Sequence, residues 1–327
     1  MPAPSVAASL IVTLLNEEDS IEVLLHSIGA QTVVPAEVVF VDGGSTDRTV
    51  EFIRAWQPPP GVSVEIRIEN GAGISRGRNR GIEAARHDLL FVTDAGTRLD
   101  AQWSARMWEA FEAPNPPDVV SGFFRPTGST FLERAIAFVA TPRLAEISPE
   151  AFLPSSRSVG FTREAWSTAG GYPEWLDYGE DLVFDLALRD TGRTFAFTPD
   201  AWVTWSARPH LPGFMTQYFR YARGDGKAGL WPRRHAARYA AYGAGTALLV
   251  LLPRNRSLAA PLALAGAWYL RTTWMRVLMR RAEFGPGWMR ALALAPVIVA
   301  AGDVAKMVGY PVGVIWRLRR AGRADGR

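Results

Sequence analysis

The sequence predicts an α/β fold in which a mostly parallel sheet, flanked by helices, is followed by a C-terminal region of hydrophobic helices. Two observations support this prediction. Short β-branched runs alternate with helical patterns through the first part of the chain, and long runs without charged residues appear in the last third. The length of 327 residues allows one large domain or two ordinary ones, and a hydrophobic content of 48% excludes a disordered tail.

The first part of the chain is predicted to alternate between strands and helices. Strands are expected at four short runs of apolar or β-branched residues, namely 9–15, 37–42, 62–69 and 89–94. Helical patterns lie between them, near 20–30, 46–56 and 74–86. Later strands are expected at 118–124 and 195–205, and later helices at 131–147 and 180–191. This alternation indicates parallel strands joined by helical crossovers.

Polar residues stand at the ends of three expected strands. Asn16, Asp42 and Asp94 each follow or close an apolar run. In sheets of this class, ligands bind at the carboxyl ends of the strands, and a nucleotide pocket needs polar groups gathered at that edge. Asp and Asn also favour turns for conformational reasons alone, which is the second interpretation of each residue taken singly.

The last third of the chain is predicted to contact a membrane. Charge-free runs cover 239–253, 257–270 and 291–302, each shorter than the ~20 residues that span a bilayer core. Arginines border these runs and can reach the lipid headgroups, so two spans are expected near 236–253 and 257–275. Buried helices of a soluble domain are the alternative.

The segment 289–320 is expected to be re-entrant or to lie along the membrane interface. A third crossing would place the Arg-rich tail and the Arg-rich loop 271–290 on opposite sides, against the positive-inside rule. On a helix, polar residues from Asp303 to Arg317 form one stripe, while Val308 and Val312 fall on another face. That pattern is typical of an interfacial helix.

Charge is divided unevenly along the chain. Residues 201–327 hold 20 Arg and Lys against 4 Asp and Glu, whereas residues 1–200 hold 16 against 28. The basic part is expected to face membrane lipids rather than nucleic acid, because its arginines alternate with apolar runs. No signal peptide is expected, since no basic region precedes the N-terminal apolar run, and the absence of cysteine excludes disulfides and thiolate metal sites.

Six short motifs occur in order along the chain. They are "TLLNEE" (13–18), "VDGGSTDRT" (41–49), "GRNRGI" (77–82), "FVTDAG" (91–96), "GGYPEWLDYGED" (170–181) and "QYFRY" (217–221). Together they resemble a family 2 glycosyltransferase with the Rossmann-like GT-A fold, over residues 8–230. The resemblance implies a glycosyltransferase domain at 1–230 and a membrane-associated helical region at 231–327.

By this resemblance, the first half of the domain binds a nucleotide-diphosphate sugar as donor. Contacts to the base and ribose are implied for Thr13, Asn16, Glu17 and Asp42, and a nucleotide contact is implied for Arg78. The run "GAGISRGRN" (71–79) also resembles a dinucleotide fingerprint, which would indicate an oxidoreductase. Its glycine spacing and its place between later strands do not match that motif.

Asp94 takes the place of the family's metal-binding acid, and is expected to contact both the donor and a metal. A divalent cation, Mg²⁺ or Mn²⁺, offsets the negative charge of a diphosphate leaving group. Gly96 stands where the family usually has a second acid. Phosphate oxygens and water would therefore complete most of the coordination shell.

The "GED" run places two acids at the start of a helix. By resemblance, Asp181 is the base that takes the proton of the acceptor hydroxyl, and Glu180 orients it or binds the acceptor. Trp175 belongs to the loop that faces the acceptor in the family. Acids in a first helical turn are also stabilised by the helix macrodipole, which is the alternative interpretation.

The "QYFRY" motif is similar to the Q-x-x-R-W element of processive polysaccharide synthases. The similarity implies that Gln217 and Arg220 face the donor diphosphate. Tyr221 stands in place of the tryptophan and is expected to stack on an acceptor sugar. The alternative is a basic segment that enters the membrane headgroups.

These features favour an inverting glycosyltransferase, a multi-pass protein of the cell membrane with its catalytic domain in the cytosol. It would move a sugar from a nucleotide-diphosphate sugar to a lipid-linked or polysaccharide acceptor. The alternative from another class is a non-catalytic membrane protein that binds sugar nucleotides or glycans. The retained acids Asp42, Asp94 and Asp181 argue against that alternative, because a scaffold needs none of them.

Overall fold

The computed structural model describes residues 3–324, which divide into two compact units. The first unit comprises Met1–Arg125 and Leu144–Ser206, and the second comprises Pro126–Arg143 and Ala207–Arg327. Each unit is therefore assembled from two separate parts of the chain.

An eight-stranded sheet forms the centre of the first unit, in the order β3–β2–β1–β4–β7–β6–β8–β5. The strands are β1 (Ser5–Leu14), β2 (Val34–Asp42), β3 (Ser63–Ile68), β4 (Leu89–Asp94), β5 (Thr97–Leu99), β6 (Val119–Thr127), β7 (Val159–Thr162) and β8 (Phe195–Ser206). β1 pairs in parallel with β2 and β4, and β2 with β3. β7 pairs antiparallel with β4 and β6, and β5 with β8. The predicted α/β class is confirmed, with parallel pairing confined to the first four strands.

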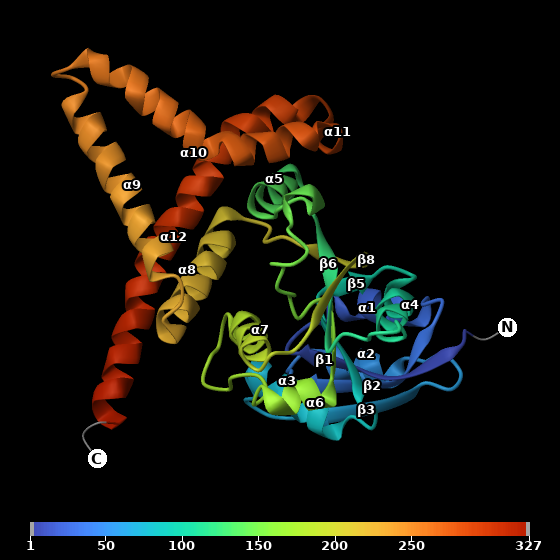
Figure 1. Ribbon diagram of the computed structural model, residues 1–327. Coiled ribbons are helices and arrows are strands. Elements are labelled where there is room, and N and C mark those ends of the chain that lie inside the picture. The colour runs from blue at the N-terminus through green and yellow to red at the C-terminus, as the bar shows by residue number, and fades with distance from the viewer. Residues whose placement is uncertain (1–2, 325–327) are drawn as a thin grey trace. The chain divides into compact units, whose positions relative to one another are not determined.

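Helices cover both faces of this sheet (Figure 1). They are α1 (Ile21–Gly29), α2 (Thr49–Ala55), α3 (Ile74–Ala84), α4 (Trp103–Phe111), α6 (Arg163–Thr168) and α7 (Glu180–Asp190). Successive residues of β1 alternate between two cores, because side chains of a strand point to opposite faces. Leu10 and Val12 are buried with Trp103 of α4, while Ile11 is buried with Phe184 of α7. The sheet is thus held between two apolar cores, one on each face.

The second unit is helical. Its helices are α5 (Phe131–Ala140), α8 (Leu211–Ala228), α9 (Pro232–Leu251), α10 (Ala259–Met279), α11 (Arg281–Phe284) and α12 (Trp288–Ala324). α8 and α12 run side by side, and glycines allow their backbones to touch (Figure 1). A Cβ added at Gly226 would collide with the carbonyl oxygen of Tyr310, and one at Gly313 would collide with that of Arg223.

The polar stripe of α12 faces other helices of the second unit. Asp303 is buried and accepts hydrogen bonds from Arg238 Nε at 2.8 Å and from the Tyr242 hydroxyl at 3.2 Å. Val308 and Val312, on the apolar face, are exposed. α12 is one continuous helix, and its buried Asp303 finds partners on α9. The expectation of a re-entrant or interfacial segment at 289–320 stays a prediction.

Among residues 3–324, one helical segment has the length and apolar composition needed to cross a membrane, within Arg281–Arg320. α9 and α10 form a helical hairpin at the expected positions, but neither meets the same criterion. The expectation of a multi-pass protein is therefore not supported. The physical reason is that each charge-free run of the hairpin is short, and the arginines beside it fall inside the helix.

Candidate active site

The carboxyl ends of β1, β2 and β4 meet at one edge of the sheet. The strand register places Thr13 beside Asp94, and Leu14 beside Asp42. Parallel strands bring their ends to the same edge, which is why residues far apart in the sequence gather here. The sequence predicted this gathering from strand ends alone.

Two loops at this edge are joined by hydrogen bonds. Asn16 has a left-handed backbone (φ 54°), and its side-chain oxygen accepts from the Thr46 amide at 2.9 Å. The buried Asp42 carboxylate accepts from the amides of Gly44 and Ser45 at 3.0 and 2.8 Å. These carbonyl and carboxylate groups fix the loop backbone, so the edge is ordered by the residues that were expected to bind the donor.

Arg78 of α3 is a buried bridge between two acids. Its side chain is 2% exposed, and it donates to Asp94 and to Glu180, each at 2.7 Å. Burial acts to lower the pKa of Arg78, but the charges of Asp94 and Glu180 raise it overall. The guanidinium therefore joins the end of β4 to the first turn of α7. The contact expected with a nucleotide is not tested by this geometry and stays a prediction.

The two acids bound by Arg78 are shifted in opposite directions. Although burial works the other way, the charges of Arg78 and Arg157 hold the pKa of Asp94 below its ordinary value. Burial, and next the neighbouring charge of Asp181, raise the pKa of Glu180. The two acids joined by Arg78 thus differ in acidity, since the pKa of Asp94 is lowered and that of Glu180 is raised.

α7 starts where a glycine turns the chain. Gly179 has a left-handed backbone (φ 78°), and Glu180 and Asp181 follow in the first helical turn. Glu180 is buried against Arg78, whereas Asp181 is half-buried and its carboxylate accepts from the Leu182 amide at 2.9 Å. The two acids predicted from "GED" thus have different surroundings, and Asp181 is the one that reaches solvent.

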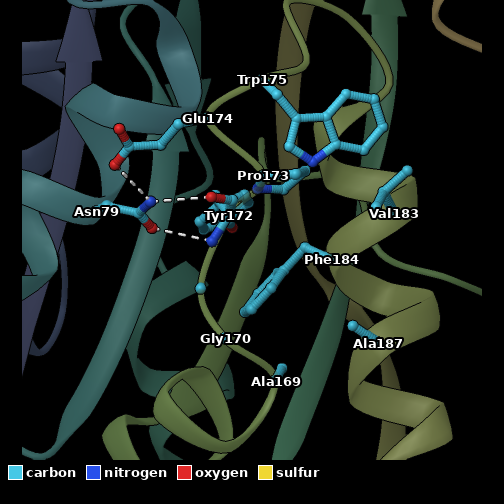
Figure 2. A pocket seen from close by; sticks show the side chains of 11 residues that line it. Asn79, Ala169, Gly170, Tyr172, Pro173, Glu174, Trp175, Val183, Phe184 and Ala187 are labelled. Atoms are coloured by element: carbon cyan, nitrogen blue, oxygen red, sulfur yellow. Dashed lines mark hydrogen bonds between the residues drawn. The ribbon is translucent and has the colours of Figure 1, made fainter. Parts of the chain in front are cut away.

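Asn79 clamps the loop that precedes α7. Its side-chain nitrogen donates to the Tyr172 carbonyl at 2.9 Å and to Glu174 at 3.1 Å, and its oxygen accepts from the Tyr172 amide at 2.9 Å (Figure 2). A cleft of about 460 Å³ opens beside this loop, lined among others by Trp175 and Val183 (Figure 2). Val183 and Asp181 lie on opposite sides of α7, since helical residues two apart are separated by about 200°. Asp181 is accordingly not among the residues that line the cleft.

Three predicted residues lie on α8, in the second unit. Gln217 and Tyr221 are one turn apart, and the Gln217 amide donates to the Tyr221 hydroxyl at 2.8 Å. Arg220 lies on the same helix. Their expected roles at the donor and acceptor concern another unit of the chain and stay predictions.

Comparisons with known proteins show the class of enzyme. Residues 9–156 match the family model described as glycosyl transferase family 2. Glycosyltransferase AglE of Haloferax volcanii is 27% identical over 223 residues, covering 66% of this chain and 72% of that protein. The protein is a glycosyltransferase with a family 2 domain.

Two further comparisons extend this assignment. The succinoglycan biosynthesis protein ExoA of Rhizobium meliloti is 28% identical over 240 residues, covering 68% of this chain and 70% of that protein. The structure of mannosyltransferase PcManGT from Pyrobaculum calidifontis, in complex with GDP-Man and Mn²⁺, has a TM-score of 0.54. It is 21% identical and covers 97% of this chain and 89% of that one, which supports the fold alone.

The family 2 domain lacks the ligands of a resident metal among its described residues. Both carboxylate oxygens of Asp94 face arginines, and Gly96 offers no side chain. Residues 3–324 contain no group of three or more His, Asp or Glu side chains placed to hold a metal ion. Divalent cations need several oxygen ligands, so these residues do not fit a metal by themselves.

Arg157 is a site residue that the sequence motifs of the family 2 domain did not reveal. Its Nε lies 3.6 Å from the Asp94 carboxylate. It stands just before β7, a short strand that pairs antiparallel with β4. Only that pairing brings residue 157 next to residue 94, and no local sequence pattern predicts this position.

Asp185→Asn in the family 2 domain is expected to increase stability at neutral pH. Burial, and next the charge of Asp181, raise the pKa of the Asp185 carboxyl well above its ordinary range, and its Oδ2 has no hydrogen-bond partner in the described chain. The pKa of the Asp185 carboxyl is higher in the folded state than in the unfolded state. The contribution of this carboxyl to stability is therefore present below the unfolded pKa of about 3.9 and is lost as the pH rises through the folded pKa. The variant should therefore unfold at a higher urea concentration than the wild type at pH 7, because an amide carries no charge to bury.

Urea unfolding at pH 4 and pH 7 measures this gain. Asp190→Asn, at the exposed end of the same helix, is the control and should change little at either pH. An equal effect of Asp185→Asn at both pH values would contradict a pKa of Asp185 raised by burial.

Proposed function

We propose that the protein is an inverting transferase that moves a sugar from a nucleotide-diphosphate sugar to a lipid-linked or polysaccharide acceptor. The observation that carries the proposal is the partly solvent-accessible Asp181 in the first turn of α7. Its neighbour Glu180 is joined through Arg78 to Asp94, at the sheet edge where the carboxyl ends of β1, β2 and β4 meet; we call this the donor edge. A base placed next to a nucleotide-binding edge is the arrangement that a single displacement requires.

The proposed reaction is one displacement at the anomeric carbon. The acceptor oxygen forms the new bond to that carbon while its proton passes to the Asp181 carboxylate. The bond between the anomeric carbon and the phosphate oxygen breaks, and its electron pair leaves with the nucleoside diphosphate. Attack from the face opposite the leaving group inverts the configuration.

The donor and acceptor classes are supported by what the similar proteins bind or are named for. The PcManGT structure holds GDP-Man, and ExoA is named for succinoglycan biosynthesis, which is polysaccharide chemistry. The apolar segment within Arg281–Arg320 supports a membrane-bound acceptor and contact with membrane lipids. We place the catalytic unit in the cytosol, where nucleotide sugars are made.

A donor panel tests the proposal. The full chain is purified in detergent, and release of nucleoside diphosphate from UDP- and GDP-sugars is measured with and without a membrane lipid extract. One donor is expected to react, with faster release when the extract supplies an acceptor. The product's anomeric configuration, read by NMR, should be opposite to the donor's. Absence of release from every donor, or a retained configuration, would contradict the proposal.

A further inference from the structure

Arg157 is positioned by the backbone at the end of β4. β4 and β7 pair antiparallel with Val92 opposite Val159, and extending that register by two residues sets Arg157 opposite Asp94. The Thr93 hydroxyl donates to the Arg157 carbonyl at 2.8 Å, which secures the segment just before β7. Residues directly opposite on antiparallel strands have neighbouring side chains.

The Arg157 side chain is oriented from three directions. Its Nε lies 3.6 Å from Asp94 Oδ2, and its Nη1 donates to the Ser155 hydroxyl at 3.1 Å. Its guanidinium carbon stands 5.0 Å from the centre of the Trp205 ring. The side chain is nevertheless 24% exposed. An arginine held in this way loses little further side-chain entropy when it binds an anion.

The chemistry around Asp94 favours an anion rather than a cation. Arg78 Nη2 donates to Asp94 Oδ1 at 2.7 Å, so one carboxylate oxygen is already a hydrogen-bond acceptor. Arg157 stands beside the other oxygen. A divalent cation at Asp94 would be bound by one protein oxygen and repelled by two guanidinium groups.

We propose that Arg157 binds the donor diphosphate and supplies there the positive charge that metal-using transferases take from a divalent cation. Asp94 is then a positioning residue, which holds Arg157 at the donor edge. This inference rests on the proposed function. As the sugar–phosphate bond breaks, the electron pair stays on the diphosphate, and the N–H groups of Arg157 stabilise the added charge.

Binding of nucleoside diphosphates tests the inference separately from transfer. The full chain in detergent is titrated calorimetrically with UDP, GDP, uridine and guanosine, in the presence of EDTA. The wild-type protein should bind one diphosphate under chelation. Arg157→Gln should bind it about ten- to a hundredfold more weakly, as expected for lost charge-assisted hydrogen bonds, with nucleoside binding unchanged. Arg157→Lys, which retains charge without the planar donor pair, should fall between the two.

Two matched measurements separate position from charge. Arg106→Gln removes an arginine of α4 that pairs with Glu109 on an exposed surface, and it should leave diphosphate binding unchanged. Asp94→Asn should raise the KM for the donor sugar while the affinity for Mn²⁺ alone, followed by electron paramagnetic resonance, stays at the wild-type value. A metal ligand would instead lose Mn²⁺ affinity when its charge is removed.

The outcomes decide between the inference and the function on which it rests. Diphosphate binding that Mn²⁺ strengthens more than tenfold in the wild type, or that Arg157→Gln leaves intact, overturns the inference and leaves the proposed transferase standing. Failure to bind any nucleoside diphosphate and to turn over any donor sugar overturns both. Should Arg157→Gln unfold, the chelation arm on the wild-type protein decides alone.

Discussion

Asp181→Asn is expected to slow sugar transfer by about 10²- to 10⁴-fold, the contribution typical of one general base. The amide keeps the size of the side chain but has no basic oxygen to take the acceptor proton. Binding of the donor's nucleoside diphosphate should stay within about twofold, because the base acts on the other substrate. The expected result is thus a loss in kcat with little change in donor affinity.

The measurement is a steady-state rate with the donor found reactive in the panel, together with calorimetric binding of the diphosphate. Asp190→Asn, at the exposed last residue of α7, changes the same charge on the same helix and should keep the wild-type rate. Transfer at more than a tenth of the wild-type rate in Asp181→Asn would remove Asp181 from the role of base.

Arg78→Met is expected to lower the free energy of unfolding by about 3–5 kcal/mol, because removing one member of a buried ionic network leaves uncompensated charge. Arg78 pairs with both Asp94 and Glu180. Methionine fills much of the volume but provides neither hydrogen bond. The first unit should therefore unfold at a lower urea concentration.

Tryptophan fluorescence in urea follows this loss. Arg80→Met is the matched control, since Arg80 lies two residues along α3, is 43% exposed and pairs with Glu83 at the surface. Such surface pairs contribute about 0–1 kcal/mol. Adding Glu180→Gln to Arg78→Met should recover part of the stability, because it removes one of the acidic charges left unpaired by the loss of Arg78. Equal losses in the free energy of unfolding for Arg78→Met and Arg80→Met would contradict the interpretation of Arg78 as a buried bridge between two acids.

The parallel half of the sheet was predictable because its signals are local. β1, β2, β3 and β4 are apolar runs separated by amphipathic helices, and their order follows from short right-handed crossovers. β5, β7 and α6 have 3, 4 and 6 residues, too few for a periodic pattern. They form because partners distant in sequence are already in place.

The same distinction explains the candidate site. Asp94, Glu180 and Asp181 belong to motifs, so resemblance found them. Arg157 belongs to none, and its place beside Asp94 depends on an antiparallel pairing that only tertiary structure supplies. The different surroundings of the neighbouring acids Glu180 and Asp181 likewise depend on burial, which the sequence does not state.

The second unit gives a related lesson. The polar stripe beginning at Asp303 was visible from helical spacing, but a stripe does not state what faces it. Arg238 and Tyr242 of α9 occupy that side, and the valines Val308 and Val312 are turned outward instead. Amphipathicity therefore predicted the two faces of α12 and left their surroundings undetermined.

The glycine contact between α8 and α12 can form only after a delay during synthesis of the chain. At ~5–20 residues per second, the ~90 residues between Gly226 and Gly313 take on the order of 5–20 s to synthesise. Throughout that interval α8 is complete and its counterpart does not yet exist. Premature termination between Ala228 and Trp288 would release a chain in which the sheet and α8 are complete but α12, the packing partner of α8, is missing, and quality-control proteases should recognise it.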